Sequence, residues 1–421
     1  MDHFQLKNGE LHAENVPLSR IADEVGTPVY VYSRATFERH ARVFRDALSG
    51  VERAPHLAFA VKANPNLAVL SLLAREGYGA DVVSGGELAR ALAAGMAPTD
   101  IVFSGVGKTA AELAQGLDAG IGQFNIESGE EGRELAAIAA ARGQVAQCAL
   151  RVNPDVDAGT HDKISTGRAD NKFGVPIAHA PELFAELSAL PGIALRGLAV
   201  HIGSQLSELA PLETAFEKLG AMRRELRGAG HTITHMDLGG GLGVPYRKGE
   251  TLPSPADYGA MVARITAGWD VTLMFEPGRV IAGNAGVLLT RVVRVKRGLN
   301  HPFVIVDAAM NDLARPALYG AWHDFEAVRP GGERMTANIV GPICETGDTF
   351  AMGRDIDALA SGELGVFRTA GAYGATMASS YNSRGFVAEV MVDGADYAVV
   401  ADRILPGTIA DAERVPDFLA R

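Results

Sequence analysis

From about residue 55, short apolar and β-branched runs alternate with longer stretches in which Ala and Leu recur at helical spacing. The runs end in AVKAN (60–64), ADVVSGGE (80–87), IVFSGVGK (101–108), QFNIES (123–128), CALRVNP (148–154), GLAVHIGS (197–204), HMDLGGG (235–241) and LMFEPGR (273–279). Stretches between them, such as GGELARALAAG, end in glycine, a common helix C-cap. Eight strand-then-helix units predict an α/β fold of the (β/α)8 TIM-barrel type, with a doubly wound open sheet as the nearest rival.

Beyond about residue 285 the pattern changes to alternating strands with turn residues between them. Examples are GVLLTRVVRVKRG, MTANIVGPI and FVAEVMVDGADYAVVADR. This pattern predicts a C-terminal, mostly β domain. The beginning of the chain also reads as strands, which we expect to pack with that domain. The predicted division is therefore 1–35 (N-terminal strands), 36–285 (barrel) and 286–421 (β domain).

Composition narrows the class of protein. With 421 residues and 47% hydrophobic content, the chain can bury a substantial core. It has 39 basic and 50 acidic residues and lacks a long basic run, which argues against nucleic acid as a partner. Neither a signal-peptide profile nor a membrane-spanning apolar run is present, so we expect a cytoplasmic protein without a membrane partner. Cys148 and Cys344 are the only cysteines, too few for a disulfide framework, and nothing in the sequence calls for a metal.

In barrels of this type, catalytic groups collect at the C-terminal ends of the strands. Lys62 closes the first apolar run, and we expect it to be buried among apolar neighbours with a depressed pKa, as an amine nucleophile for a carbonyl. The alternative is a lysine that keeps its head in water. His201, Glu276 and Arg279 close two other runs. Glycines 239–241 follow the seventh run, where backbone N–H groups can approach a phosphate.

The stretches FAVKAN, HIGS, GGGLGVPY and EPGR resemble the barrel family of pyridoxal-phosphate decarboxylases related to ornithine decarboxylase and, more distantly, alanine racemase. NDLARPALYG, GPICETGD and GAYGATMASSYNSR resemble the diaminopimelate decarboxylases in particular. The resemblance runs from about Pro28 to about Arg384. It implies pyridoxal 5'-phosphate as cofactor. The implied reaction is decarboxylation of meso-2,6-diaminopimelate at its D centre to L-lysine and CO2, the last step of lysine biosynthesis.

The resemblance also implies roles for the barrel residues. Lys62 would bind the cofactor as a Schiff base, His201 would stack on its ring, and Glu276 would pair with the pyridine nitrogen. A carboxylate there keeps the ring nitrogen protonated, whereas racemases of this fold are expected to use an arginine, so Glu276 favours decarboxylation. The remaining implied cofactor-binding residues are Ser204, Gly239, Gly240, Gly241, Pro277, Gly278 and Arg279 around the phosphate, and Asp81 and Arg151 as orienting groups.

The β domain would supply the substrate-binding groups, again by resemblance. Arg315, together with Arg279, would bind substrate carboxylates, a task that suits the guanidinium fork. Cys344 would be catalytic and would protonate the substrate carbon after CO2 leaves, while Glu345 would hold a substrate ammonium. Tyr319 and Tyr373 would add hydroxyl contacts, Tyr373 to the phosphate as well. In this family such residues generally come from the neighbouring subunit, which implies a head-to-tail homodimer with shared active sites.

The sequence leaves three other functions to consider, and it argues against them to different degrees. Decarboxylases of ornithine or arginine are expected to carry Cys-Asp where this chain has Cys344 and Glu345, and their substrates lack a distal carboxylate for Arg315. A decarboxylase for another amino acid with a distal acyl group is excluded less well. A non-catalytic pyridoxal-phosphate carrier on a similar barrel would lack the β domain.

Overall fold

The computed structural model describes residues 2–159, 161, 166–167 and 170–419. The chain divides into two compact units. Unit 1 comprises Met1–Phe37, Pro245–Glu250 and Ala282–Arg421, and unit 2 comprises Glu38–Val244 and Thr251–Ile281. Residues 245–250 lie inside the range that strand counting assigns to the barrel, yet they belong to unit 1.

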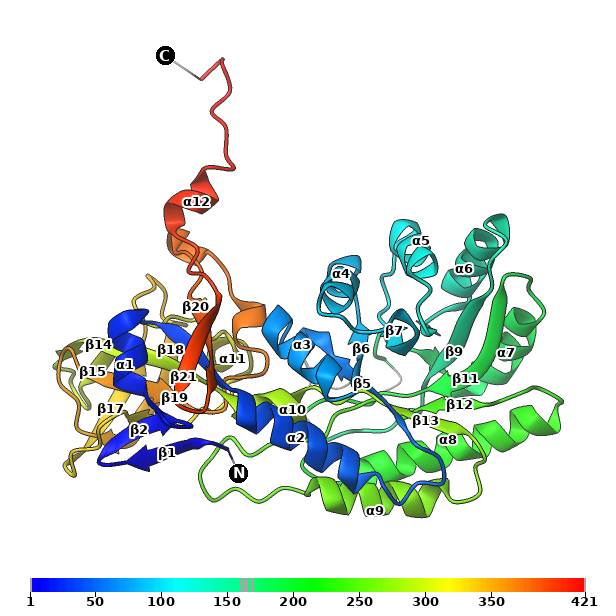
Figure 1. Ribbon diagram of the computed structural model, residues 1–421, viewed down its shortest axis with the longest axis horizontal. Helices are drawn as coiled ribbons and strands as arrows, with labels where there is room; N and C mark the ends of the chain where they lie inside the picture. Colours follow the sequence, from blue (N-terminus) through cyan, green and yellow to red (C-terminus); the bar gives the residue numbers. More distant parts are fainter. Residues whose placement is uncertain (1, 160, 162–165, 168–169, 420–421) are drawn as a thin grey trace. The chain divides into compact units, whose positions relative to one another are not determined.

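Unit 2 is a closed barrel of parallel strands (Figure 1). The strands are β5 (His56–Ala60), β6 (Gly79–Val82), β7 (Ile101–Phe103), β8 (Gln123–Ile126), β9 (Ala146–Asn153), β11 (Ile193–Ala199), β12 (His235–Asp237) and β13 (Thr272–Phe275), and β10 (Val175–Pro176) extends the edge of β9. Pairing of β13 with β5 and of β8 with β9 closes the ring. The predicted (β/α)8 barrel is confirmed.

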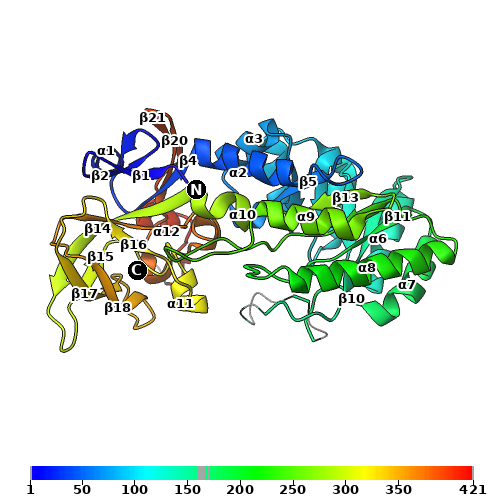
Figure 2. The ribbon, with the colours of Figure 1, turned by 90° about the horizontal axis from the view of Figure 1, so that it is seen from below.

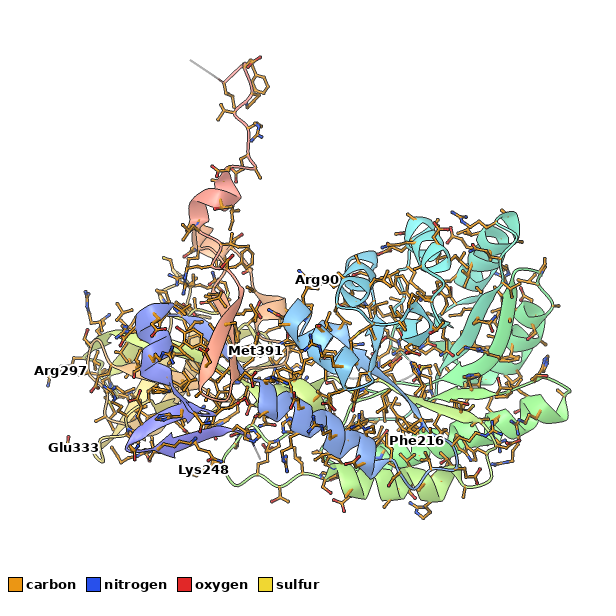
Figure 3. The ribbon with its side chains drawn as sticks, viewed as in Figure 1. Arg90, Phe216, Lys248, Arg297, Glu333 and Met391 are labelled. Carbon is orange, nitrogen blue, oxygen red and sulfur yellow. The ribbon has the colours of Figure 1, made fainter. Side chains whose placement is uncertain are left out.

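Helices follow the strands and surround the barrel (Figures 1 and 2). They are α2 (Arg34–Ala47), α3 (Leu67–Arg75), α4 (Gly85–Ala93), α5 (Ala110–Ala119), α6 (Gly129–Ala141), α7 (Ala180–Ser188), α8 (Ala210–Gly228), α9 (Pro255–Thr266) and α10 (Arg279–Ala282). Ser84 and Ser128 cap α4 and α6 by accepting backbone N–H groups, which starts each helix shortly after its strand ends. Among the side chains in Figure 3, Arg90 on α4 is exposed and Phe216 on α8 is completely buried, as expected for amphipathic helices on a barrel.

Unit 1 is built mainly from sheets. Strands β1 (Phe4–Lys7), β2 (Glu10–Ala13) and β3 (Val16–Pro17) form a small antiparallel sheet. In the larger sheet, the strands lie in the order β18 (Thr349–Asp357), β17 (Arg334–Val340), β15 (Phe303–Val306), β14 (Gly286–Lys296), β4 (Val29–Ser33), β20 (Ala388–Asp393) and β21 (Asp396–Ala401). In addition, β19 (Leu364–Phe367) pairs with β14, and β16 (Phe325–Ala327) pairs with β19. The N-terminal strand β4 lies between β14 and β20, and its Val29 and Val31 join one buried apolar core with Val287 and Val390.

Short helices complete unit 1: α1 (Leu18–Glu24), α11 (Arg315–Tyr319) and α12 (Pro406–Ala410). None of the helices in the described residues is long and apolar enough to cross a membrane.

Candidate active site

Lys62 and Asp81 form an ion pair at the C-terminal ends of β5 and β6. Strand β5 ends at Ala60, which lies opposite Asp81, and the 3-10 turn Val61–Ala63 carries Lys62 to a position 2.7 Å (Nζ to Oδ2) from the carboxylate. Asp81 is completely buried, whereas the Lys62 side chain is 35% exposed. The expected burial of Lys62 among apolar groups is therefore wrong, because the chain leaves the barrel before Lys62. The ion pair therefore fixes the position of the Lys62 amine and leaves it accessible to a ligand.

A second acidic group closes β13. Glu276 is buried, and its Oε1 atom accepts hydrogen bonds from Asn125 (3.3 Å) and from the Ser104 hydroxyl (3.4 Å). Asn125 also donates to Asp237 Oδ2 at 3.0 Å, which links the two carboxyl groups. Burial, reinforced by the negative charges of Asp237 and Asp81, raises the pKa of Glu276 well above its usual range. Burial raises the pKa of Asp237 too, so this pair of carboxyl groups favours holding a proton.

Glycines 239–241 pass close to neighbouring backbone after β12. A Cβ at Gly240 would lie 2.2 Å from the carbonyl oxygen of Glu276, and a Cβ at Gly239 would lie 2.4 Å from the carbonyl oxygen of Val200. Gly239 and Gly241 also have positive φ angles of 64° and 116°. Side chains are excluded here, so the backbone itself forms this part of the site.

His201 lies two residues after β11 and presents a neutral ring. The backbone N–H of Gly240 donates to its Nδ1 atom at 3.2 Å. Burial, with the nearby positive charges of Arg151 and Lys62, lowers the pKa of His201 well below its usual range. Arg151 is itself fixed by Glu127, whose Oε1 atom accepts from its guanidinium at 2.5 Å.

Residues 276–278 join β13 to α10, which begins at Arg279. The Pro277 carbonyl accepts from the Ala60 N–H at 3.1 Å, and a Cβ at Gly278 would lie 3.0 Å from the Cβ of Ala60. Arg279 then donates through Nε (3.2 Å) and Nη2 (3.0 Å) to the Ser204 hydroxyl. The residues predicted for the barrel part of the site thus come together on one end of unit 2.

The predicted residues of unit 1 fall on three segments. Arg315 and Tyr319 begin and end α11. Cys344 and Glu345 are exposed and contact the turn Tyr381–Ser383: Asn382 Oδ1 accepts the Cys344 N–H at 3.0 Å, and the Tyr381 hydroxyl donates to the Glu345 carboxylate, which raises the pKa of Tyr381. Tyr373 has a φ of +55°, a strained value for a bulky residue and a common feature of functional sites.

Several contacts were not predicted from the sequence. Asn125 and Glu127 lie in QFNIES, and Asp237 lies in HMDLGGG. Asn125 is the last residue but one of β8, Glu127 follows that strand and Asp237 ends β12, so all three share the signal that pointed to His201 and Glu276. The other unpredicted partners lie outside the strands, where strand periodicity gives no signal. Tyr381 and Asn382 lie in a 3-10 turn, and His323, whose Nε2 atom lies 2.9 Å from Nη1 of Arg315, lies in an irregular segment.

Comparison with known proteins identifies the family of this chain. The family described as "Pyridoxal-dependent decarboxylase, pyridoxal binding domain" matches residues 34–283. The diaminopimelate decarboxylase of Zymomonas mobilis is 52% identical over 402 residues, covering 95% of this chain and 96% of that protein. The Pseudomonas aeruginosa enzyme of the same name is 53% identical, covering 94% of each chain. This chain belongs to the diaminopimelate decarboxylase family.

Solved structures agree with this membership. The diaminopimelate decarboxylase of M. jannaschii in complex with L-lysine superposes with a TM-score of 0.96 at 33% identity, covering 99% of both chains. The Vibrio vulnificus lysine/ornithine decarboxylase complexed with putrescine has a TM-score of 0.79 at 19% identity, which shows the shared fold alone.

The site fits the family's pyridoxal-phosphate cofactor. The buried Asp81 Oδ1 atom has no hydrogen-bond partner among the described residues, so this carboxylate can accept from a further donor beside Lys62. The glycine run excludes side chains, so a phosphate can approach the backbone there; the N–H groups of Gly239 and Gly240 donate to Asp237 Oδ1 and His201 Nδ1 within the protein. The carboxyl pair of Glu276 and Asp237 provides a proton and a buried negative charge for a basic ring nitrogen.

Proposed function

We propose that this chain decarboxylates meso-2,6-diaminopimelate at its D centre and releases L-lysine and CO2. The observation that carries the reaction type is the Lys62–Asp81 pair at the same barrel end as the buried Glu276 carboxyl. The substrate follows from relatives about half identical over nearly the whole chain, all named diaminopimelate decarboxylase.

Pyridoxal phosphate, when bound, supplies an electron sink for the bond that releases CO2. Lys62 would hold its reactive carbon, and Asp81 would orient the Lys62 amine through the 2.7 Å contact. Glu276 would place a proton on the ring nitrogen and stay beside it as the counter-ion, while Asn125 and Asp237 hold Glu276 in place. His201, neutral and fixed by Gly240, would pack on the ring without adding a competing charge.

The phosphate would be bound by Ser204, by the glycine run and by the backbone of residues 276–279. Arg279 lies against Ser204 and would therefore reach a substrate carboxylate from beside the phosphate. Arg151, held by Glu127, would support the His201 loop through its 3.5 Å contact with the His201 carbonyl.

For the substrate, Arg315 would bind the carboxylate at the L centre, and Glu345 the ammonium there. Tyr319 and Tyr373 would add hydroxyl contacts. Cys344 would donate the proton that replaces CO2 on the reacting carbon; its exposure and the fixed backbone beside Asn382 suit that task. We expect these groups to act on the cofactor of the neighbouring subunit in a homodimer. The cytoplasmic location expected from the sequence stays a prediction.

The test is CO2 release by the purified protein on a panel of meso-, LL- and DD-diaminopimelate, ornithine, arginine and L-lysine. We expect rapid turnover of the meso isomer. Comparable kcat/KM for ornithine or arginine would instead support a polyamine-pathway decarboxylase, and turnover of an amino acid with another distal acyl group, added to the panel, would support a decarboxylase of that class.

A further inference from the structure

Arg315 is enclosed in unit 1 by two side chains that the sequence did not point to. It is 5% exposed, and its Nη1 atom lies 2.9 Å from Nε2 of His323. The ring of Tyr246 covers the guanidinium, with 4.3 Å between Cζ and the ring centroid. The direction of the guanidinium therefore depends on these neighbours as well as on α11.

The contacts of His323 specify a single tautomer. Arginine can only donate, so Nε2 must accept the hydrogen bond from Arg315. The other ring nitrogen, Nδ1, lies 2.8 Å from the carbonyl oxygen of Arg368, which can only accept, so Nδ1 must carry the proton. His323 is thus a neutral acceptor that orients the guanidinium without adding a negative charge to it.

His323 is itself held rigidly. It is 3% exposed, and its ring meets the Tyr246 ring edge-on at 5.1 Å. Arg354 donates to the His323 carbonyl at 2.9 Å and also stacks on the indole of Trp322, with 3.3 Å from Cζ to the ring centroid. Trp322 in turn donates through Nε1 to Asp324 at 2.6 Å.

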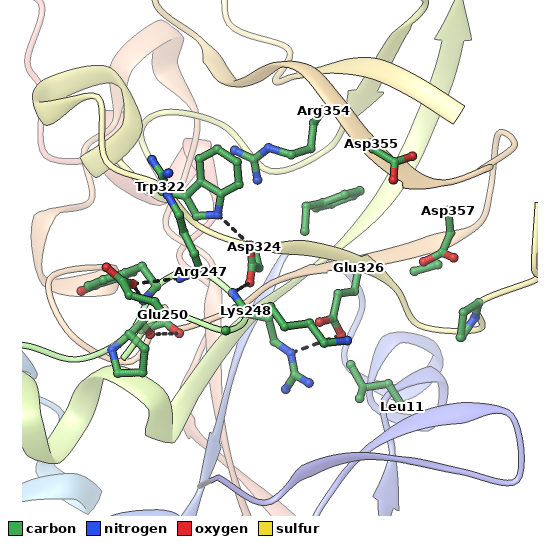
Figure 4. A pocket seen from close by; sticks show the side chains of 18 of the residues that line it. Leu11, Arg247, Lys248, Glu250, Trp322, Asp324, Glu326, Arg354, Asp355 and Asp357 are labelled. Carbon is green, nitrogen blue, oxygen red and sulfur yellow. Dashed lines mark hydrogen bonds and ion pairs between the residues drawn. The ribbon is translucent and has the colours of Figure 1, made fainter. Parts of the chain in front are cut away.

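Trp322, Asp324 and Arg354 line a pocket of about 780 Å³ in unit 1 (Figure 4). Figure 4 shows Trp322 between the side chains of Arg247 and Arg354, with Asp324 below it. Arg247 covers the indole at 4.2 Å from Cζ to the ring centroid. These stacked groups fix the chain on both sides of His323, so the imidazole has little freedom to turn away from Arg315.

We infer that His323 is a positioning residue that aims Arg315 at the substrate carboxylate distal to the reacting centre. The inference rests on the proposed function for its substrate. It assigns His323 no contact with the substrate: its effect passes through Arg315, by way of the Nε2–Nη1 hydrogen bond. Removing that bond should therefore weaken recognition of the distal carboxylate and leave the chemical step on the cofactor largely unchanged.

The sharpest test compares two amide variants of nearly equal polarity. In His323→Gln the amide oxygen can reach the place of Nε2 and accept from Arg315. In His323→Asn the amide reaches only the place of Nδ1, which keeps the contact with Arg368 and loses the contact with Arg315. We expect His323→Asn to raise KM for meso-diaminopimelate by about tenfold or more, with kcat changed less than about threefold, because hydrogen bonds to charged groups contribute in this range. His323→Gln should stay within about threefold of the wild type in both constants.

A binding measurement separates this inference from the proposed function. The holoenzyme is titrated with L-lysine, which carries the carboxylate, and with cadaverine, which lacks it, and binding is followed by cofactor absorbance. His323→Asn should weaken the binding of L-lysine and leave the binding of cadaverine unchanged. Arg315→Ala should show the same pattern more strongly. Cofactor content and Tm are measured for every variant.

If the Asn and Gln variants had equal KM values and equal affinities for L-lysine, whether like the wild type or both impaired, the inference would be overturned. A residue that only fills space would not depend on where its hydrogen-bond acceptor lies. Failure of the wild type to release CO2 from meso-diaminopimelate would instead remove the proposed function, and the lysine and cadaverine titrations would still decide the role of His323.

Discussion

At the scale of single residues, Lys62 is the side chain on which the proposed chemistry depends. Its Nζ atom is fixed by Asp81, and the Lys62 side chain remains 35% exposed. We expect borohydride to attach the cofactor to Lys62 and to no other residue, because only an accessible amine at this end of the barrel can reach the cofactor carbonyl. Peptide mapping after reduction checks this, and Lys62→Ala should abolish the attachment. Modification of Lys108, which is buried against Glu131, would show that the assignment is wrong.

Glu276 predicts an unusual pH dependence of stability in the cofactor-free protein. Its pKa in the folded state is raised well above the ordinary value of 4.5, first by burial and then by Asp237. The folded protein therefore holds a proton that the unfolded chain releases. The stabilising effect is complete below about pH 4.5 and is lost as pH rises, by up to about 1.4 kcal/mol per pH unit.

Glu276→Gln removes this titration. Thermal unfolding of the cofactor-free variant should show a larger gain in Tm over the wild type at pH 8 than at pH 5.5. Glu134→Gln, an exposed change on α6, is the control and should leave the pH profile unchanged. Parallel profiles for Glu276→Gln and the wild type would contradict the raised pKa.

The sequence predicted where site residues lie along the strands better than it predicted which side chains they contact. AVKAN places Lys62 at a strand end, but its partner Asp81 depends on the pairing of Ala60 with Asp81 across β5 and β6, which no local pattern encodes. The same holds for His323, whose partner Arg368 lies 45 residues later in the chain.

At the scale of elements, the loop after β12 makes the clearest prediction. Gly240→Ala would bring a Cβ within 2.2 Å of the Glu276 carbonyl oxygen, so the two loops must move apart. Overpacking of this kind costs about 1–3 kcal/mol, which we expect to appear as cofactor affinity weakened by about tenfold or more. The Kd for the cofactor is measured by absorbance titration of the cofactor-free protein.

Gly107→Ala is the matched control, since a Cβ there meets nothing within 4 Å, and it should bind the cofactor like the wild type. Equal affinity of the Gly240→Ala variant would show that the glycine loop is not part of the cofactor site.

Elements within the repeating strand-then-helix pattern were predictable, including the three-residue strands β7 and β12, whereas short elements outside that repeat were not. The barrel strands are buried on both faces and read as apolar runs, so all eight could be predicted from the sequence. Strand β16, with three residues, carries too little pattern. The parallel pairing of β4 with β20 joins distant parts of the chain and follows from the tertiary fold.

At the scale of the whole molecule, the proposed homodimer with shared sites predicts complementation. Lys62→Ala and Cys344→Ala should each be inactive alone. After subunit exchange, a mixed dimer would contain one site with both residues intact and one with neither, so we expect recovery of about a quarter of wild-type activity at random mixing. Exchange is verified separately with tagged subunits. Absence of recovery despite exchange would mean that Lys62 and Cys344 act within one chain.

The central claim concerns which carboxylate leaves. Loss of CO2 from the D centre of meso-diaminopimelate gives L-lysine, whereas loss from the L centre gives D-lysine. The most direct measurement uses the purified holoenzyme and meso-diaminopimelate labelled with ¹³C in the D-centre carboxylate. We predict that all of the label appears in CO2 and that the product is unlabelled L-lysine. Labelled lysine, D-lysine, or no CO2 from the meso isomer would contradict the account.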